Sequence, residues 1–259
     1  MTVAAESGAL ARFRLDGRVA VVTGGSRGIG RAIAFGLAEA GASVAIAARD
    51  PDRCAATASE MAARGARAIA VAADVSRDEE VERLFERVDR ELGPARVLIA
   101  CAGVATGGPS LQCGRDELQR MLDVHLLGPI AAARAAALRM QGHGGGSIVF
   151  VTSVWGLGGA SRTLAYGTAK AALAHAVRVL AVEWAPQAIR VNGLAPGIVD
   201  TDMTASLDPG AREALLRKIP MRRAARPDEM VGPALLLASD AGSFLTGHVL
   251  VVDGGERAR

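Results

Sequence analysis

A glycine-rich segment near the start of the chain constrains the fold more than any other feature of the sequence. Gly24–Gly30 reads G-G-S-R-G-I-G; it follows a short β-branched run, Arg18–Thr23, and precedes an amphipathic stretch that extends to Ala40. Glycines let a backbone approach a pyrophosphate closely, and the N-terminus of the following helix offers free N–H groups to an anion. A glycine turn can also serve only to reverse the chain. The segment therefore predicts a strand–turn–helix unit whose turn is able to bind phosphate.

Strand and helix patterns alternate along the rest of the chain. Further strands are predicted at Ser43–Ala48, Arg67–Ala72, Arg96–Ala100, Ser147–Val151, Ile189–Gly193 and His248–Val252. Helices are predicted at Arg77–Leu92, Glu117–Met140 with a break near Gly128-Pro129, Leu164–Trp184 and Pro227–Ser239. This order predicts an α/β fold, with one doubly wound parallel sheet of about seven strands, helices on both faces and right-handed crossovers. We expect residues 15–259 to form this single domain and residues 1–14 to be a flexible tail.

Composition and charge argue against several other classes of protein. Half of the residues are hydrophobic and only 3% are aromatic, which suits a parallel sheet wrapped in helices. The pI is about 9.1, yet the net charge is only +3 and the arginines are scattered. Without a basic stripe interleaved with aromatic residues, we expect no nucleic-acid partner. No uninterrupted apolar run reaches the roughly 18 residues of a membrane span, so we expect no membrane partner either.

Cysteine and histidine usage indicates a reducing compartment and no metal site. Cys54, Cys101 and Cys113 are odd in number and form no C-x-x-C pair. The N-terminus has no apolar segment of the secretory type, so we expect a cytoplasmic protein. The histidines have no acidic or thiol partners at metal-ligand spacing, and we therefore predict no catalytic metal.

Tyr166 and Lys170 are the strongest candidates for chemistry. They lie four residues apart on the predicted helix 164–184, so their side chains share one face of it. A neighbouring ammonium favours the phenolate, and we expect Lys170 to lower the pKa of Tyr166. Ser153 lies thirteen residues upstream, just after the predicted strand 147–151, where open α/β sheets place their functional groups. A Y-x-x-x-K pattern alone also arises by chance on exposed helices.

The end of the second predicted strand bears on which dinucleotide the chain prefers. An acid at this tip would bond the 2′-hydroxyl of an adenosine ribose, whereas an arginine would suit a 2′-phosphate. The tip reads Ala48-Arg49, with no acid before Asp50, and Arg27 lies in the glycine segment. Two arginines near one expected phosphate favour NADP(H) over NAD(H), unless their side chains point to solvent.

Several short motifs occur together in one order and spacing. They are T-G-G-S-R-G-I-G at Thr23–Gly30, A-D-V at Ala73–Val75, A-G at Ala102-Gly103, Ser153, Y-x-x-x-K at Tyr166–Lys170, I-R-V-N at Ile189–Asn192, P-G at Pro196-Gly197 and a C-terminal V-D-G-G. From about Leu15 to Gly255 the chain therefore resembles the single-domain short-chain dehydrogenase/reductases. The P-G-x-x-x-T-x-M string and the C-terminal ending are similar to 3-oxoacyl-(acyl-carrier-protein) reductases and their relatives.

The resemblance implies a Rossmann fold and specific roles for the motif residues. Ser153 would polarise a substrate carbonyl, Tyr166 would exchange a proton with the substrate oxygen, and Lys170 would hold the nicotinamide ribose. Asp74 and Val75 would meet the adenine, and the segment 202–223 would cover the substrate. The implied cofactor-binding residues are Thr23, Gly24, Ser26, Arg27, Gly28, Ile29, Gly30, Arg49, Asp74, Val75, Ala102, Gly103, Tyr166, Lys170, Pro196, Gly197, Val199 and Thr201.

Two departures from the family pattern stand out. The usual N-N-A-G reads Ala100-Cys101-Ala102-Gly103, which removes two side-chain amides. The usual V-N-L, whose asparagine holds a water that relays protons towards the lysine, reads Val124-His125-Leu126. Because histidine donates, accepts and titrates near neutral pH, our hypothesis is that His125 is a fourth catalytic residue that replaces this asparagine. The alternative is that His125 only packs between helices.

The favoured function is NADPH-dependent reduction of a ketone to a secondary alcohol, or its reverse, on a small-molecule substrate. An NAD-preferring alcohol dehydrogenase is one alternative, and a regulator that binds NADPH without catalysis is another. Gln187 and the region of His143 stand where carrier-protein reductases have docking arginines, so acyl-carrier substrates are not favoured and substrate identity stays open. The resemblance also implies a homotetramer or a homodimer. Trp155 lies two residues after Ser153, so it either lines the substrate pocket or belongs to the core.

Overall fold

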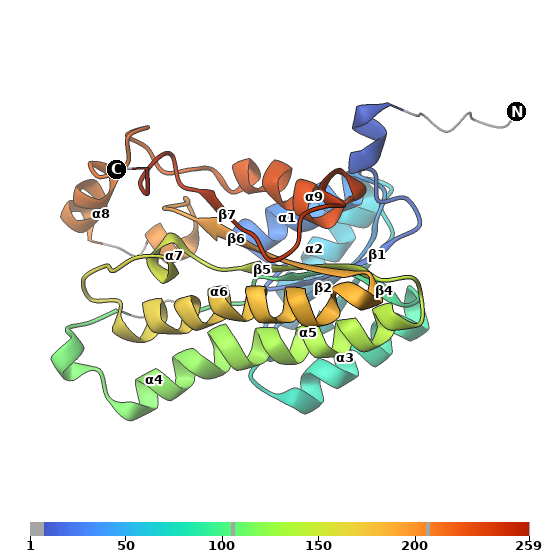
Figure 1. Ribbon diagram of the computed structural model, residues 1–259, viewed down its shortest axis with the longest axis horizontal. Helices are drawn as coiled ribbons and strands as arrows, with labels where there is room; N and C mark the ends of the chain where they lie inside the picture. The colour runs from blue at the N-terminus through green and yellow to red at the C-terminus, as the bar shows by residue number, and fades with distance from the viewer. Residues whose placement is uncertain (1–7, 105–106, 206–207, 259) are drawn as a thin grey trace, which may run out of the picture.

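One twisted parallel sheet forms the centre of the molecule (Figure 1). The computed structural model describes residues 8–104, 107–205 and 208–258. Within them the sheet has seven strands in the order β3-β2-β1-β4-β5-β6-β7, which confirms the predicted α/β fold. The strands are β1 Val19–Thr23, β2 Ser43–Ala48, β3 Ala68–Ala72, β4 Ala95–Ala100, β5 Gly146–Val151, β6 Ile189–Pro196 and β7 Val249–Val252.

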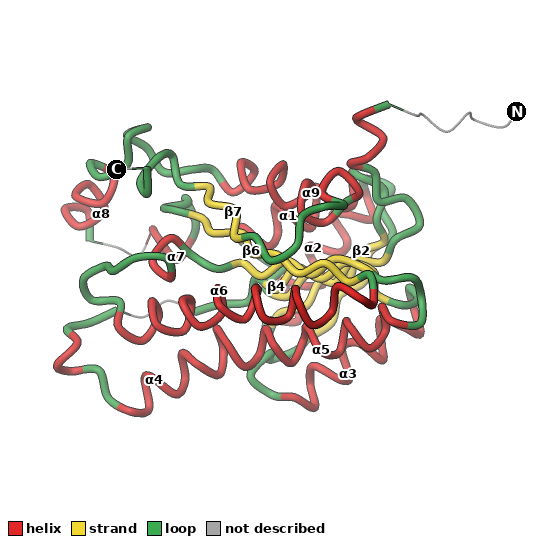
Figure 2. Tube along the Cα trace, in the orientation of Figure 1, coloured by secondary structure: helices red, strands yellow, loops and turns green. Residues whose placement is uncertain are grey.

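Helices cover both faces of the sheet, as Figure 2 shows. The described helices are α1 Gly28–Glu39, α2 Pro51–Ala63, α3 Asp78–Glu91, α4 Arg115–Leu122, α5 Gly128–Gln141, α6 Leu164–Trp184, α7 Asp202–Ala205, α8 Pro209–Leu216 and α9 Val231–Ala238. Helices α3, α5 and α6 pack on one face, and α1, α2 and α9 pack on the other.

Alternation along each strand explains the two layers. In β1, Val19 and Val21 belong to the core shared with α3, α5 and α6, whereas Ala20 and Val22 belong to the core shared with α1, α2 and α9. Successive side chains of a strand point to opposite faces, and a parallel sheet covered on both faces is apolar throughout. All five residues of β1 are buried, which is why this strand reads as a continuous apolar run.

The long central helix differs from its prediction in an informative way. It runs without interruption from Arg115 to Gln141, but residues Asp123–Leu127 form a π turn between α4 and α5. Pro129 has no N–H to donate to the carbonyl four residues earlier, and the N–H of Gly128 instead reaches the carbonyl of Asp123, five residues back. The predicted break is therefore a local widening of the helix, of a kind that often marks functional sites.

Other bounds were predicted closely, but helices α2, α7 and α8 were not predicted. Most strand ends agree within one residue, although β6 continues to Pro196. Helix α2 was not predicted, although Asp50 caps it and Pro51 stands in its first turn. Part of the predicted N-terminal tail is a 3₁₀ helix, Ala9–Phe13, and residues 1–7 lie outside the described residues. Helix 115–141 is long and apolar enough to span a membrane, but half of its most apolar window is buried, as in the core helix of a soluble protein.

Candidate active site

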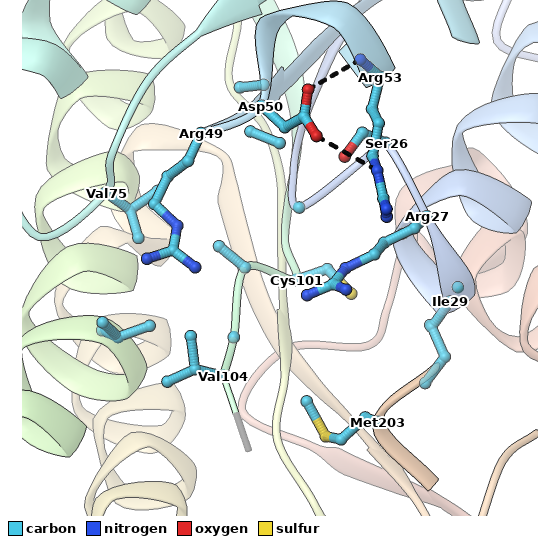
Figure 3. Close-up of a pocket in the computed structure, with 18 of the residues that line it drawn as sticks. Ser26, Arg27, Ile29, Arg49, Asp50, Arg53, Val75, Cys101, Val104 and Met203 are labelled. Atoms are coloured by element: carbon cyan, nitrogen blue, oxygen red, sulfur yellow. Dashed lines mark hydrogen bonds and ion pairs between the residues drawn. The ribbon is translucent and has the colours of Figure 1, made fainter. Parts of the chain in front are cut away.

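A cavity opens at the carboxyl ends of the strands, where the strand order reverses between β1 and β4. Open α/β sheets bind ligands at this reversal. The glycine segment, the end of β2, the residues after β3 and the residues after β4 all contribute to its walls (Figure 3). It is lined by Gly24, Ser26, Arg27, Gly28, Ile29, Gly30, Ala47, Ala48, Arg49, Asp50, Arg53, Ala73, Asp74, Val75, Cys101, Ala102, Gly103, Val104, Val124, Thr201, Asp202 and Met203.

Close backbone packing explains the glycines of the first turn. Gly24 has a φ of +70°, and a Cβ on it would lie 2.8 Å from the Cα of Ala102. A Cβ on Gly30 would lie 2.3 Å from the carbonyl oxygen of Gly24. Thr23 fixes the same junction, because its hydroxyl accepts hydrogen bonds from the backbone N–H groups of Cys101 (3.2 Å) and Ala102 (3.3 Å). The turn therefore holds the N-terminus of α1 against the end of β4, directed at the cavity.

Three arginines supply positive charge to the part of this cavity next to the end of β2. The side chains of Arg27 and Arg49 extend into it from opposite walls, and Arg53 lies beside Arg27 (Figure 3). Asp50 caps α2 by accepting from the N–H of Arg53 at 3.1 Å, and its carboxylate also pairs with the guanidinium of Arg53 at 3.2 Å. The one acid at the tip of β2 is therefore engaged with its own helix. Arg53 was missed in the sequence, although Asp50-Pro51 is a typical helix start and places it in the first turn.

Asp74 reaches the cavity in a fixed conformation. Its side chain accepts from the N–H of Ser76 at 3.0 Å and from the Ser76 hydroxyl at 2.7 Å. Although burial opposes ionisation, these hydrogen bonds and the charge of Arg49 hold the pKa of Asp74 below its ordinary value. The carboxylate is therefore ionised at neutral pH, and it gives the β3 wall of the cavity an acceptor that interacts electrostatically with Arg49.

Ser153 and Tyr166 meet beyond the end of β5. Tyr166 stands in the first turn of α6 and makes a side-chain hydrogen bond with Ser153. The prediction that Lys170 lowers the pKa of Tyr166 is wrong in this structure. Burial raises that pKa and outweighs the hydrogen bond with Ser153. Tyr166 is therefore protonated at neutral pH.

Lys170 lies one helical turn further along, inside the protein. It is only 5% exposed, and its ammonium donates to the carbonyl of Val151 at 2.6 Å. The same nitrogen lies 5.8 Å from the centre of the Tyr166 ring. Burial lowers the pKa of Lys170 to about 8, so the ammonium is charged at pH 7 but close to its titration range. The predicted shared helix face is confirmed, and the strand end fixes where the ammonium stands.

His125 projects from the π turn into the same buried region. It is 1% exposed and packs edge-on against Tyr166, with ring centres 5.0 Å apart. Its Nε2 lies 2.9 Å from the carbonyl oxygen of Val104, and its Nδ1 is buried without a hydrogen-bond partner in the described residues. Burial and the charge of Lys170 lower the pKa of His125 to about 3. The expectation that His125 titrates near neutral pH is therefore wrong: the imidazole is neutral there.

The predicted substrate-covering segment carries an apolar wall. Ile198, Ile219 and Ala224 form a small buried cluster, with Trp155 packed against it together with Leu215 and Leu216 of α8. The Trp155 ring is also edge-on to Tyr166, at 6.1 Å between centres. Trp155 thus joins this cluster to the Tyr166 side chain. That it lines a substrate pocket stays a prediction. Residues 206–207 of the segment lie outside the described residues.

Most of the predicted cofactor-binding residues line the cavity. Thr23, Pro196, Gly197 and Val199 do not: Thr23 ties β1 to β4, the N–H of Gly197 bonds the carbonyl of Val252, and Val199 bridges to Ala225. Ser153, Tyr166, Lys170 and His125 are likewise absent from its lining and gather in the buried region described above. Among the described residues, no group of three or more His, Cys, Asp or Glu is placed to hold a metal ion.

Comparisons with known proteins identify the family of this arrangement. Residues 24–256 match the protein family described as Enoyl-(Acyl carrier protein) reductase. The chain is 34% identical to 2-dehydro-3-deoxy-D-gluconate 5-dehydrogenase of Pseudoalteromonas atlantica, over 96% of this chain and all of that protein. It is also 34% identical to 3-oxoacyl-(acyl-carrier-protein) reductase of Aquifex aeolicus, over 94% and 98% of the two chains. A solved gluconate 5-dehydrogenase of Burkholderia cenocepacia, in complex with NADP and tartrate, superimposes with a TM-score of 0.93 at 33% identity, over 97% of this chain and 100% of that chain.

Proposed function

The chain belongs to the short-chain dehydrogenase/reductase family, and from this premise we propose that it reduces a ketone to a secondary alcohol, or runs the reverse reaction, with NADP(H) preferred over NAD(H). That it is an oxidoreductase acting on CH–OH and C=O groups follows from the named dehydrogenases and reductases among its relatives. The observation that carries the proposal is the meeting of the half-buried Tyr166 with the buried Ser153 and Lys170, beside a glycine-rich cavity.

The cavity residues fit a phosphorylated dinucleotide. The glycine turn lines the cavity at the N-terminus of α1, where a pyrophosphate would meet backbone N–H groups and the positive end of the helix dipole. Arg27, Arg49 and Arg53 would hold a 2′-phosphate, since guanidinium groups match phosphate geometry. Asp50, which would accept from a free 2′-hydroxyl, already pairs with Arg53. These contacts support a preference for NADP(H).

The protein's own groups supply proton transfer and positioning. Hydride transfer is the chemistry that the nicotinamide supplies when bound. Tyr166 holds a proton at neutral pH because its pKa is raised, so it can donate that proton to the developing alkoxide, which favours reduction at neutral pH. Ser153 would hold the carbonyl oxygen by a hydrogen bond. Lys170 uses one of its three donors on Val151, which leaves two for the nicotinamide ribose hydroxyls.

His125 takes part as a neutral hydrogen-bonding group in this proposal. With Nε2–H donating to the carbonyl of Val104, the buried Nδ1 becomes an acceptor close to Tyr166 and Lys170. A water bonded there would continue the proton path to Lys170, in place of the asparagine that the family pattern expects. A purely structural role would leave Nδ1 unsatisfied in the interior, which is costly.

Assembly and location complete the proposal. Leu138 on α5 and Val182 on α6 are 68% and 79% exposed. An interface on α5 and α6 would bury these apolar side chains, which supports a homotetramer or a homodimer. Sedimentation equilibrium would show the assembly directly. The cysteines at positions 54, 101 and 113 are free thiols, which supports a cytoplasmic location.

The direct test is oxidation of NADPH, with NADH in parallel, against a panel of ketones that includes a β-ketoacyl thioester. We expect turnover of at least one ketone with NADPH. Tyr166→Phe should lower that rate by roughly 10²- to 10⁴-fold while NADPH binding persists, because only the proton donor is removed. A rate unaffected by Tyr166→Phe would contradict the proposed mechanism. Tight NADPH binding with no turnover of any ketone would favour a regulator over an enzyme.

A further inference from the structure

The first residue of α7 carries a carboxylate that stands between two of the cavity arginines. Asp202 lies 3.5 Å from Nη1 of Arg27 and 3.7 Å from Nη1 of Arg53, measured from its Oδ2. Arg27 caps the N-terminus of α1, and Arg53 is in the first turn of α2, so the three residues come from three separate elements. All three line the dinucleotide cavity. The carboxylate thus neutralises positive charge at the place where the site would need it for phosphate.

Asp202 also forms part of a second cavity. This cavity is lined by Asp200, Thr201, Asp202, Ala205, Arg212, Glu213 and Leu216, and it shares Thr201 and Asp202 with the dinucleotide cavity. Asp200 pairs with Arg212 at 2.5 Å, which ties the residues just before α7 to α8. A displacement of Asp202 from the arginines would therefore move a wall that is common to both cavities.

The ion pairs of Asp202 are suited to displacement. Its side chain is 68% exposed, and those of Arg27 and Arg53 are 53% and 55% exposed. Exposed carboxylate–guanidinium pairs at such distances contribute little, because water and salt screen them. A phosphate monoester carries more charge than a carboxylate and offers three acceptor oxygens, so it binds a guanidinium pair more strongly.

We propose that Asp202 occupies Arg27 and Arg53 as a stand-in anion, so that the 2′-phosphate of NADP(H) must displace it. This inference rests on the proposed function and goes beyond it in making Asp202 a determinant of cofactor affinity. Displacement frees the start of α7 from the arginines and changes the wall shared with the second cavity. Cofactor binding and the conformation of α7 are thereby coupled through one side chain.

The test compares Asp202→Asn with Asp200→Asn by calorimetric titration with NADPH and with NADH. Both variants remove one negative charge, from positions two residues apart. Asp202 contacts Arg27 and Arg53, whereas Asp200 contacts Arg212. We expect Asp202→Asn to tighten NADPH binding roughly three- to tenfold at low salt and to leave NADH binding within about twofold, whereas Asp200→Asn changes neither. In hydrogen exchange without cofactor, the amides of 202–205 should exchange faster in Asp202→Asn than in wild type.

Two results would overturn the inference alone. One is NADPH binding that responds equally to the two variants, and the other is NADH binding that tightens as much as NADPH binding in Asp202→Asn, since the displaced site would then not belong to the 2′-phosphate. Failure of wild type and both variants to bind NADPH would overturn the proposed function together with the inference. Because Asp202 is exposed, the variant should keep the fold, and its circular dichroism spectrum checks this.

Discussion

Two regions of the site differ in how solvent reaches their charged groups. One is the cluster of Ser153, Tyr166, Lys170 and His125; the other is the arginine corner, the part of the cavity formed by Arg27, Arg53 and Asp202. Lys170 and His125 are 5% and 1% exposed, and burial moves the pKa of each far from its ordinary value. Arg27 and Arg53 are more than half exposed, and their ion pairs with Asp202 span 3.5 and 3.7 Å. In the first region the protein interior sets the charge state; in the second, opposite charges pair where solvent reaches them.

This difference indicates that one region suits proton transfer and the other suits anion binding. Burial, together with the charge of Lys170 acting on His125, sets the protonation of the cluster, which suits a step that moves a proton. The ion pairs of Arg27 and Arg53 with Asp202 are exposed and weak, which suits a step that binds and releases an anion. Solution conditions should therefore affect the two regions differently: pH acts on the cluster, and salt acts on the corner.

The largest effect should come from raising the pH through the titration of Lys170. Because burial lowers the pKa of Lys170 to about 8, its side chain is charged below that pH and neutral above it. The reductase rate should fall with the loss of this charge. We expect the rate to be flat from pH 6 to 7 and to fall about tenfold per unit well above pH 8. Steady-state rates at saturating ketone measure this. A profile that stays flat to pH 10 would show that the charge of Lys170 is not required.

A smaller effect should appear in acid stability through His125. In the unfolded chain this imidazole titrates near 6.5, whereas the folded form stays neutral until about 3. The unfolded state therefore binds the extra proton between these values, and stability falls as the pH is lowered. Between pH 7 and pH 5 the wild type should lose about 2 kcal/mol more than His125→Asn. Urea unfolding of both proteins at the two pH values measures the difference, and parallel losses would show that His125 is charged in the folded protein.

The smallest effect should come from the arginine corner. Arg53→Gln should weaken NADPH binding roughly three- to tenfold with little change for NADH, because one phosphate partner is lost. Arg64→Gln is the matched control: Arg64 lies just past the C-terminal end of α2, pairs with Glu60 and does not line the cavity. Fluorescence titrations at about 0.05 M and about 0.5 M salt should show the Arg53 effect shrinking with salt. Equal effects of the two substitutions would show that only net charge matters.

How far the sequence predicted the site can be judged residue by residue. Glycine positions, strand ends and the Tyr166–Lys170 spacing are local features, and the structure places them as expected. Arg53 and Asp202 were missed as partners because 149 positions (202 − 53) separate them in the chain. The predicted lowering of the Tyr166 pKa and the expected titration of His125 near neutral pH were wrong because both depend on burial, which no local pattern records.

The sequence by itself determined the alternation of strands and helices, the family, and which residues we propose to carry the chemistry. Those features follow from hydrophobic periodicity, from glycines that only tight packing requires, and from motif spacing. Tertiary structure alone decided the charge state of Tyr166, Lys170 and His125 and the pairing of Asp202 with Arg27 and Arg53. The physical reason is that desolvation and ion pairing depend on which distant segments lie side by side, and only the packing of the complete fold fixes that.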